Sequence, residues 1–525
     1  QEQRTPWRAG AHSRHNPTGR TGHEHFPGAF FTELGCTNTS GHCYGLHYAW
    51  SGGHDMIAEQ MPDGRRQVQF GHAHGSQLQP MFQYASAPLY LAYSNHGMNG
   101  CAIQFQREVR RTIVRPTQAG SVRPVHYNCW EAVYFKHNVD ELMAIAQQAA
   151  SLGAERFVLD DGWFGTRDDD TQSLGDWWID ARKYPDGLEP LVTGVKQLGM
   201  QFGIWFEPEM INDNSDIYRL HSDWVLGPED QILGRQQKVL NLSREEVRQY
   251  LFERISDLLS TYRIDYIKWD HNRVLPHYDN DQITGVYKLI DRLRASFPEV
   301  EIETCASGGG RIDFGMLERT QRVWLSDSND AIERSRIQAG AARFLPASVT
   351  GSHVGPRHCH TSGRNLSIQF RSWVAAQRHM GFEMDPRELT SEEAEVLQRI
   401  TTWWKHERAF LMEADIHLLD NQDPSVICEQ HMSASQARFI LFANKVDTSS
   451  QILPATIRLT QLIPERNYTI TLVNRDELHH LSRGTPLLKH QSLTVSGLYL
   501  MHKGIELPWS FPCQTWTLVG EMIHD

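Results

Sequence analysis

Several features that define large classes of protein are missing from this chain. No uncharged apolar run reaches the ~18 residues that a membrane-spanning helix needs. Basic residues are outnumbered, with 51 Lys and Arg against 63 Asp and Glu and a net charge of −12. That balance argues against nucleic acid or an anionic membrane surface as a partner. The 8 cysteines form no CxxC pair, so we expect reduced thiols in a cytoplasmic protein rather than a disulfide framework.

The size and apolar content are those of a large globular protein. The 525 residues are 40% hydrophobic and include 15 Trp, 16 Tyr and 21 Phe, which suits a molecule with many stacking surfaces. The chain opens at Gln1 without an initiator Met or the apolar core of a signal peptide. We therefore expect it to start inside a longer protein, within an N-terminal sheet domain.

The hydrophobic pattern divides the chain into three parts. Residues 1–115 carry short alternating runs between turn residues, which predicts the remainder of an antiparallel β-sandwich and a linker helix from about Asn99 to Val114. Residues 116–413 alternate short apolar runs with amphipathic segments, one of which predicts a helix over about 139–152. Residues 414–525 return to short β-rich runs and predict a C-terminal antiparallel β-sandwich.

The middle part predicts eight strands. Their runs are VHYNCWEAVYF, RFVLDDGWF, FGIWFEPE, IDYIKWDHN, EIETCASGG, RVWLSDSND, ASVTGSHVG and MGFEMD. Polar residues stand at the ends of six of them: Asp160, Asp161, Glu207, Glu209, Asp270, Cys305, Asp327 and His353. An open doubly wound sheet would concentrate its site at one switch point, whereas the strand ends of a barrel converge on one mouth. The spread of polar ends predicts an α/β fold with a central (β/α)8 TIM barrel between the two β-rich parts.

The run IDYIKWDHN carries the first candidate catalyst. Strand alternation sends Lys268, Asp270 and Asn272 to one face. If that face lines the barrel, Lys268 favours the ionised form of Asp270, which a nucleophile requires. A structural ion pair at a strand end would explain the same spacing.

The run VWLSDSND offers a second carboxylate. Two carboxylates across a scissile bond perform glycoside hydrolysis, one as nucleophile and one as acid and then base. Asp330 precedes AIERSRIQAGAARF, where it or Asn329 suits a helix N-cap. The spacing favours Asp327 as the catalyst but leaves Asp330 open.

The adjacent carboxylates Asp160 and Asp161 could bind sugar hydroxyls or a metal. Neighbouring strand residues point to opposite faces, so both reach one ligand only if the strand end bends, and Gly162 could supply that bend. The Gly-rich turn CASGGGR, which starts at Cys305, lacks the spacing of a phosphate loop, and its glycines would let backbone approach a ligand closely.

Metal-binding patterns are weak. His353, His358, Cys359 and His360 match no usual zinc spacing, and the acidic run at 168–170 lacks the spacing of a calcium loop. We therefore expect no metal and no other cofactor. Any single Trp after these strands is more often a core residue than a sugar platform.

Six blocks of the sequence resemble those of family 36 α-galactosidases of the bacterial melibiose/raffinose type. They are LDDGWFG, GIWFEPEMIN, YIKWDHNR, ETCASGGGRIDFGML, WLSDSNDAIER and GSHVGP…HTSGR, in family order from about Trp130 to Arg364. The resemblance implies a barrel enzyme that needs no metal. It implies a retaining hydrolase of terminal, nonreducing α-D-galactosyl residues, with melibiose, raffinose and related galactooligosaccharides as substrates.

The resemblance also implies roles for individual residues. Asp270 falls on the family's nucleophile, and Asp327 rather than Asp330 falls on its acid/base. The positions that fall on galactose-binding residues are Trp130, Asp160, Asp161, Trp205, Arg235, Lys268, Asn272, Cys305 and Gly308. The family carries a larger N-terminal sandwich that helps to build a homotetramer, in which a neighbouring subunit's loop closes the active site. A tetramer is therefore expected of the full-length form and stays open for this chain.

Several other functions compete with hydrolysis. A galactosyltransferase of the raffinose- or stachyose-synthase type would use the same two carboxylates. An α-N-acetylgalactosaminidase is disfavoured because Cys305, by the resemblance, keeps the pocket small near the sugar's 2-position. A non-catalytic carbohydrate-binding protein would not need Lys268, Asp270 and Asp327 together, and a metallohydrolase would lose activity on chelation.

Overall fold

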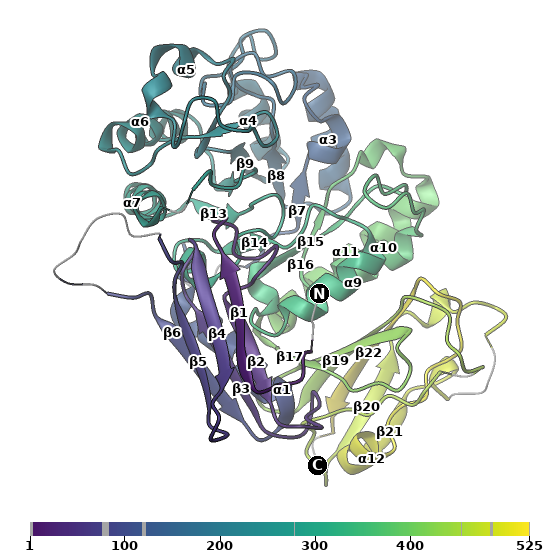
Figure 1. Cartoon of the computed structure of the whole chain (residues 1–525). Coiled ribbons are helices and arrows are strands. Elements are labelled where there is room, and N and C mark those ends of the chain that lie inside the picture. The colour runs from purple at the N-terminus through teal and green to yellow at the C-terminus, as the bar shows by residue number, and fades with distance from the viewer. Residues whose placement is uncertain are drawn as a thin grey trace.

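A closed barrel of eight parallel strands forms the centre of the molecule (Figure 1). The structure is a computed structural model that describes residues 4–75, 83, 85–117, 122–277, 279–452, 454–482 and 487–523. The barrel strands are β7 (His126–Asn128), β8 (Arg156–Leu159), β9 (Gln201–Phe206), β12 (Tyr266–Trp269), β13 (Glu301–Thr304), β14 (Arg322–Trp324), β15 (Thr350–Val354) and β16 (His379–Phe382). Each overlaps one of the eight predicted runs, and β16 pairs with β7 to close the ring. The predicted (β/α)8 barrel is confirmed.

Helices surround this barrel. The larger ones are α3 (Val139–Ser151), α4 (Glu189–Gln197), α6 (Glu245–Thr261), α7 (Asn280–Ser296), α9 (Ala331–Ala341), α10 (Ile368–Ala375) and α11 (Ser391–Glu413). The helix predicted over 139–152 is α3, where the side chain of Asn138 accepts hydrogen bonds from the backbone N–H groups of Asp140 and Glu141. Such a cap satisfies N–H groups that the first turn leaves without helical partners. The apolar face of α3 buries Leu142 and Ile145 against the barrel core.

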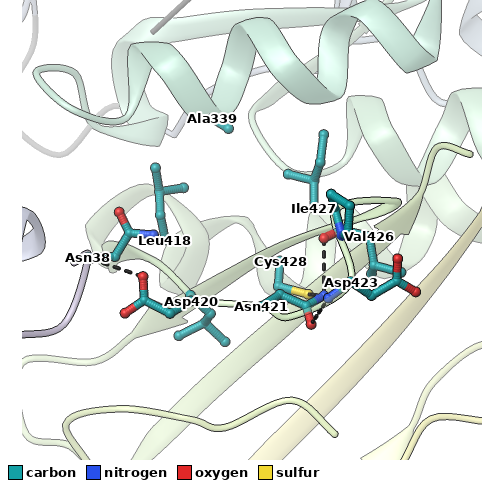
Figure 2. A pocket seen from close by; sticks show the side chains of 11 residues that line it. Asn38, Ala339, Leu418, Asp420, Asn421, Asp423, Val426, Ile427 and Cys428 are labelled. Carbon is teal, nitrogen blue, oxygen red and sulfur yellow. Dashed lines mark hydrogen bonds between the residues drawn. The ribbon is translucent and has the colours of Figure 1, made fainter. Parts of the chain in front are cut away.

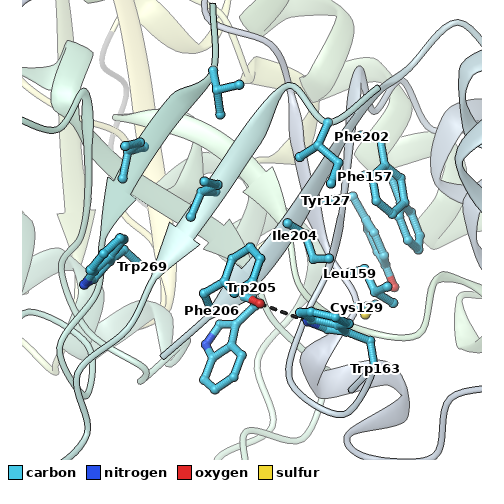
Figure 3. Close-up of a cluster of buried hydrophobic side chains, with 14 of the residues drawn as sticks. Tyr127, Cys129, Phe157, Leu159, Trp163, Phe202, Ile204, Trp205, Phe206 and Trp269 are labelled. Atoms are coloured by element: carbon cyan, nitrogen blue, oxygen red, sulfur yellow. Dashed lines mark hydrogen bonds between the residues drawn. The ribbon is translucent and has the colours of Figure 1, made fainter. Parts of the chain in front are cut away.

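Aromatic side chains fill much of the core around β8, β9 and β12 (Figure 3). The Trp163 indole N–H donates to the main-chain oxygen of Trp205 at 2.9 Å, which ties the loop after β8 to β9. A buried polar cluster lies among strands β13 to β16. In it, Arg322 contacts His353 at 2.9 Å and His379 at 3.1 Å and pairs with Glu303. Barrel interiors are more commonly filled by branched aliphatic residues.

Two β-rich regions flank the barrel and lie side by side below it in Figure 1. The N-terminal region has two three-stranded antiparallel sheets, formed by β1 (Gly10–Asn16), β4 (His54–Gln60) and β5 (Arg66–His72), and by β2 (Gly28–Thr32), β3 (Cys43–Tyr48) and β6 (Leu89–Ser94). The C-terminal region has one six-stranded antiparallel sheet, with β17 (Asp415–Leu418), β18 (Val426–Met432), β19 (Arg438–Lys445), β22 (Gln514–Met522), β20 (Asn467–Leu472) and β21 (Leu493–Ser496) in that order.

The predicted linker helix joins the two flanks. It consists of α1 (Gly97–Glu108) and a π-helical turn at Val109–Ile113. The Asn99 side chain, predicted to lie in this helix, exchanges two hydrogen bonds with the backbone of Leu418 in β17, at 2.9 and 3.1 Å. Among the described residues, no helix is long and apolar enough to cross a membrane.

Candidate active site

The carboxyl ends of the barrel strands bring the predicted polar residues to one mouth. Asp160 follows β8, Glu207 follows β9, Asp270 follows β12 and Cys305 follows β13, and all four are buried. The chain turns sharply after Asp160 and Asp161 because Gly162 has a φ of +118°, a conformation that residues with a Cβ rarely adopt. The predicted bend is therefore present.

Four donors surround the carboxylate of Asp270. Its Oδ2 accepts from the Asn272 side-chain amide at 2.8 Å and from the Trp205 indole at 3.2 Å. Its Oδ1 accepts from the backbone N–H groups of His271 at 2.8 Å and Ser307 at 3.2 Å. Donors of this kind stabilise an ionised carboxylate and hold it in one orientation.

Lys268 contacts a different carboxylate from the one that its spacing predicts. Its ammonium donates to Asp160 Oδ2 at 2.8 Å, and the Asn128 amide donates to the same oxygen at 2.6 Å. Lys268 thus acts on Asp270 as a nearby charge rather than as a bonded partner. Burial raises the pKa of Asp270, but the Lys268 and Arg235 cations and the hydrogen bonds more than offset it, so that this pKa lies below its ordinary value.

Asp327 has the opposite surroundings. One hydrogen bond to its side chain is present among the described residues, from the Trp324 indole to Oδ1 at 2.9 Å. The residue is exposed at the mouth. The surrounding protein displaces part of the water around its carboxyl group, and this desolvation together with the nearby Asp270 charge raises the pKa of Asp327 above its ordinary value. Two carboxylates whose pKa values are pushed apart are suited to opposite protonation roles.

The Gly-rich turn after β13 brings these two carboxylates together. Ser307 donates to Asp270, while a Cβ on Gly308 would lie 2.7 Å from the backbone nitrogen of Asp327. Gly308 also has a φ of +79°. The sequence predicts that these glycines admit a ligand, but at Gly308 the close approach is to the backbone of the Asp327 loop. Cys305 is buried, and its thiol is influenced by the charges of both Asp270 and Asp327.

The remaining predicted positions surround this centre. Both oxygens of Asp161 accept from Arg167 at 3.0 Å, a bidentate pair in which both side chains are buried. Arg235 donates to Asp170 at 3.2 Å, and the charges of Glu207, Asp161 and Asp270 raise its pKa despite the effect of burial. Trp130 begins the short helix α2 (Trp130–Val133) and is half-buried.

Asp330, the open alternative to Asp327, is an N-cap. Its side chain accepts from the first backbone N–H groups of α9 and from Ser362 at 2.6 Å. In the described part of the chain, no group of three or more His, Cys, Asp or Glu could hold a metal ion.

Glu207 belongs to the site although the sequence predicts no chemistry for it. Its carboxyl group accepts from the backbone N–H of Asn272 at 2.5 Å and from the Gln237 amide at 2.9 Å. Burial, together with the Asp270 charge, raises the pKa of Glu207 to about 8. Its position at a strand end is a local signal, but its partners lie 30 and 65 positions away.

A segment between β1 and β2 also reaches the mouth, which the sequence pattern does not predict. The Arg20 guanidinium donates to the main-chain oxygen of Asn272, and Gly22 N–H donates to Gly310 O at 2.9 Å. The Thr21 hydroxyl donates to Asp313 at 2.6 Å. These contacts join residues more than 250 positions apart, so local patterning gives no sign of them.

A second hollow lies away from the mouth, beside β17 and β18 (Figure 2). Its Asp420 accepts backbone N–H groups from Asn38 at 3.0 Å and Thr39 at 3.2 Å. Asp423, the other carboxylate in its lining, accepts from the Ser425 hydroxyl at 2.6 Å, so both carboxylates are held by neighbouring residues. The barrel mouth is therefore the better candidate for chemistry.

Comparison with known proteins shows which family the chain belongs to. The melibiase family model matches residues 83–414, and the model of the glycosyl hydrolase family 36 N-terminal domain matches residues 1–79. An Escherichia coli α-galactosidase is 41% identical over 512 residues, which cover 94% of this chain and 72% of that protein. The bifunctional α-galactosidase/sucrose kinase AgaSK of Mediterraneibacter gnavus is 33% identical, and the match covers 96% of this chain but 53% of that protein.

A solved structure of the family 36 α-galactosidase AgaA from Geobacillus stearothermophilus superposes with a TM-score of 0.91 at 30% identity, covering 99% of this chain and 73% of the other. A variant of AgaA has been solved in complex with raffinose. The family model covers more than half of the chain, and the E. coli relative exceeds 30% identity over most of its own length. The chain is therefore a member of glycoside hydrolase family 36, with a catalytic barrel of the melibiase type.

Proposed function

We propose that the chain hydrolyses terminal nonreducing α-D-galactosyl residues of melibiose, raffinose and related galactooligosaccharides with retention of configuration. The observation that carries the proposal is the carboxylate pair, in which the pKa of Asp270 is lowered and that of Asp327 is raised. Double displacement needs one carboxyl group that is ionised and one that is protonated, and the directions of these two pKa shifts favour that assignment. The relatives named α-galactosidases and the raffinose complex of AgaA support the choice of sugar.

In the proposed mechanism, Asp270 attacks the anomeric carbon while Asp327 protonates the departing oxygen. The covalent galactosyl-enzyme is then cleaved by a water molecule whose proton passes to Asp327. The donors around Asp270 keep its carboxylate ionised and oriented for attack. Retention of configuration predicts carboxyl groups about 5–5.5 Å apart rather than about 9 Å.

The proposed sugar-binding residues surround this pair: Trp130, Asp160, Asp161, Trp205, Arg235, Lys268, Asn272, Cys305 and Gly308. The Lys268–Asp160 pair is buried at the mouth, so a sugar hydroxyl that replaces solvent there must satisfy these groups. A site built to hydrogen-bond an axial hydroxyl rejects the equatorial epimer because its polar groups are then left unpaired. Such a site favours galactose over glucose.

Covalent trapping tests the proposal directly. A 2-deoxy-2-fluoro-α-galactosyl fluoride is expected to label Asp270, which peptide mapping would locate. The first sugar released from an aryl α-galactoside is expected to be α-galactose by NMR. A label on another residue, or β-galactose as the first product, contradicts the proposed mechanism. A predominance of transfer product at low acceptor concentration would indicate a galactosyltransferase instead.

We also propose a cytoplasmic enzyme whose full-length form is a homotetramer. Eight free cysteines, seven of them buried, fit a reducing compartment. Light scattering of the full-length protein tests the tetramer, and a monomeric mass contradicts it.

A further inference from the structure

Trp324 is the last residue of β14, three positions before Asp327. Its indole N–H donates to Asp327 Oδ1 at 2.9 Å, and its side chain is 1% exposed. Neither the sequence blocks nor the chemistry of the proposed sugar-binding groups assigns it a task. An indole N–H can donate a hydrogen bond but cannot accept one. Its contact therefore makes the two oxygens of the Asp327 carboxyl group unequal, because only Oδ1 accepts from it.

The indole has little freedom to turn away from Asp327. The Arg334 guanidinium carbon lies 4.1 Å from the centre of the indole, and the His353 ring centre lies 4.1 Å from it. His353 is itself held by Glu383 at 2.8 Å and by Arg322 at 2.9 Å. A cation over the aromatic face and a tilted ring packed against the indole both favour one indole orientation. The donor is therefore a fixed part of the site.

A fixed donor at Oδ1 decides where a proton can reside on Asp327. In a protonated carboxyl group the carbonyl oxygen is the better acceptor, so the indole N–H at Oδ1 favours the form in which Oδ2 carries the proton. On the basis of the proposed function, we propose that Trp324 is a positioning residue that keeps the acidic proton of Asp327 on Oδ2. In the first step the Oδ2–H bond breaks as the glycosidic oxygen takes that proton and its bond to the anomeric carbon breaks. In the second step Oδ2 takes a proton from the attacking water.

The same contact sets the ionisation of Asp327 together with its charged neighbours. The titratable and charged groups near it are Lys268 in β12, Asp270 after β12, Arg235, Cys305, Arg334 on α9, Glu383 after β16, and His360 after β15. The indole donor stabilises the ionised form, so its removal raises the pKa of Asp327. The proposed first step needs the protonated form, and the alkaline limb of kcat/KM follows this pKa.

The test is Trp324→Phe, which keeps an aromatic ring beside Arg334 and His353 but removes the donor. The alkaline limb of kcat/KM is expected to move up by about one pH unit. kcat/KM for melibiose is expected to fall about tenfold at neutral pH, and by less than about threefold for 4-nitrophenyl α-galactoside, whose leaving group needs little protonation. Rates are expressed per site titrated with the fluorinated galactosyl fluoride, so that unfolded molecules do not enter the comparison.

Trp404→Phe is the matched control, because Trp404 is equally buried and its indole donates to the Arg378 main-chain oxygen at 3.0 Å. It should lower stability without moving the limb. In an Asp327→Asn background, Trp324→Phe should change the aryl galactoside rate by less than about twofold, since residues that act through one another are not additive.

An unmoved alkaline limb, equal losses on both substrates, or additive losses in the double variant each overturn the positioning role. Failure of the native chain to hydrolyse either substrate would contradict the proposed function instead, and would be seen before any variant is made.

Discussion

The two carboxylates at the barrel mouth are held in contrasting ways. Asp270 accepts four hydrogen bonds and is buried, with the Lys268 charge nearby. Asp327 accepts one hydrogen bond from the described residues and stands exposed to the solvent of the mouth. A group that must stay ionised benefits from many donors, whereas a group that must gain and lose a proton needs an oxygen left free. The count of donors therefore distinguishes the two proposed roles more clearly than the residue type, which is the same.

The strongest way to break this comparison is to remove each carboxylate in turn. Asp270→Ala should lower the turnover of 4-nitrophenyl α-galactoside by about 10⁴-fold or more, and Asp327→Ala should lower that of melibiose by about 10²–10⁴-fold. With 4-nitrophenyl α-galactoside as the substrate, azide should accelerate both variants but give opposite anomers, because each displacement inverts the anomeric carbon. We expect β-galactosyl azide from the Asp270 variant and α-galactosyl azide from the Asp327 variant, distinguished by NMR. The same anomer from both variants would contradict separate roles.

A smaller change should affect the pKa of Asp270 and leave that of Asp327 unchanged. Asn272→Ala removes the 2.8 Å donor to Asp270, so the pKa of this carboxyl rises. Since the proposed nucleophile must be ionised, the acid limb of kcat/KM should shift to higher pH by up to about one unit, while the alkaline limb stays in place. Asn421→Ala, which removes an amide bonded to Val426 O in the distant hollow, is the control. A shift of both limbs would show that the two carboxyls are not independently tuned.

The smallest expected effect is a difference in stability between two glycine variants, which tests how tightly the Gly-rich turn packs against the Asp327 loop. Gly308 and Gly199 have φ angles of +79° and +80°, but of the two only Gly308 has atoms within 4 Å of the position that a Cβ would take. Gly199→Ala should cost about 1–2 kcal/mol in the free energy of unfolding. Gly308→Ala should cost about 2–4 kcal/mol, because overpacking adds to the conformational cost. Denaturant titration measures both, and equal losses would show that the Asp327 loop gives way easily.

Much of the scaffold could be predicted because its signals are local. The eight barrel strands are short apolar runs, six of them with polar ends, and α3 has its cap and apolar stripe within a few residues. The partners at the mouth could not be predicted in the same way. Lys268 bonds to Asp160, 108 positions away, because closure of the barrel brings β8 and β12 to either side of β9. Local alternation correctly placed Lys268 near Asp270. It could not show which of two carboxylates on different strands, Asp160 or Asp270, accepts the hydrogen bond from Lys268.

The contact of the β1–β2 segment with the mouth has a consequence for engineering. A Cβ on Gly22 would lie 2.0 Å from the Gly309 carbonyl oxygen, so the two main chains touch with no room for a side chain. If the barrel were transferred alone into another protein, the mouth would lose its contacts with the β1–β2 segment. Libraries made by recombining homologous genes should therefore take this flanking segment and the barrel from the same parent.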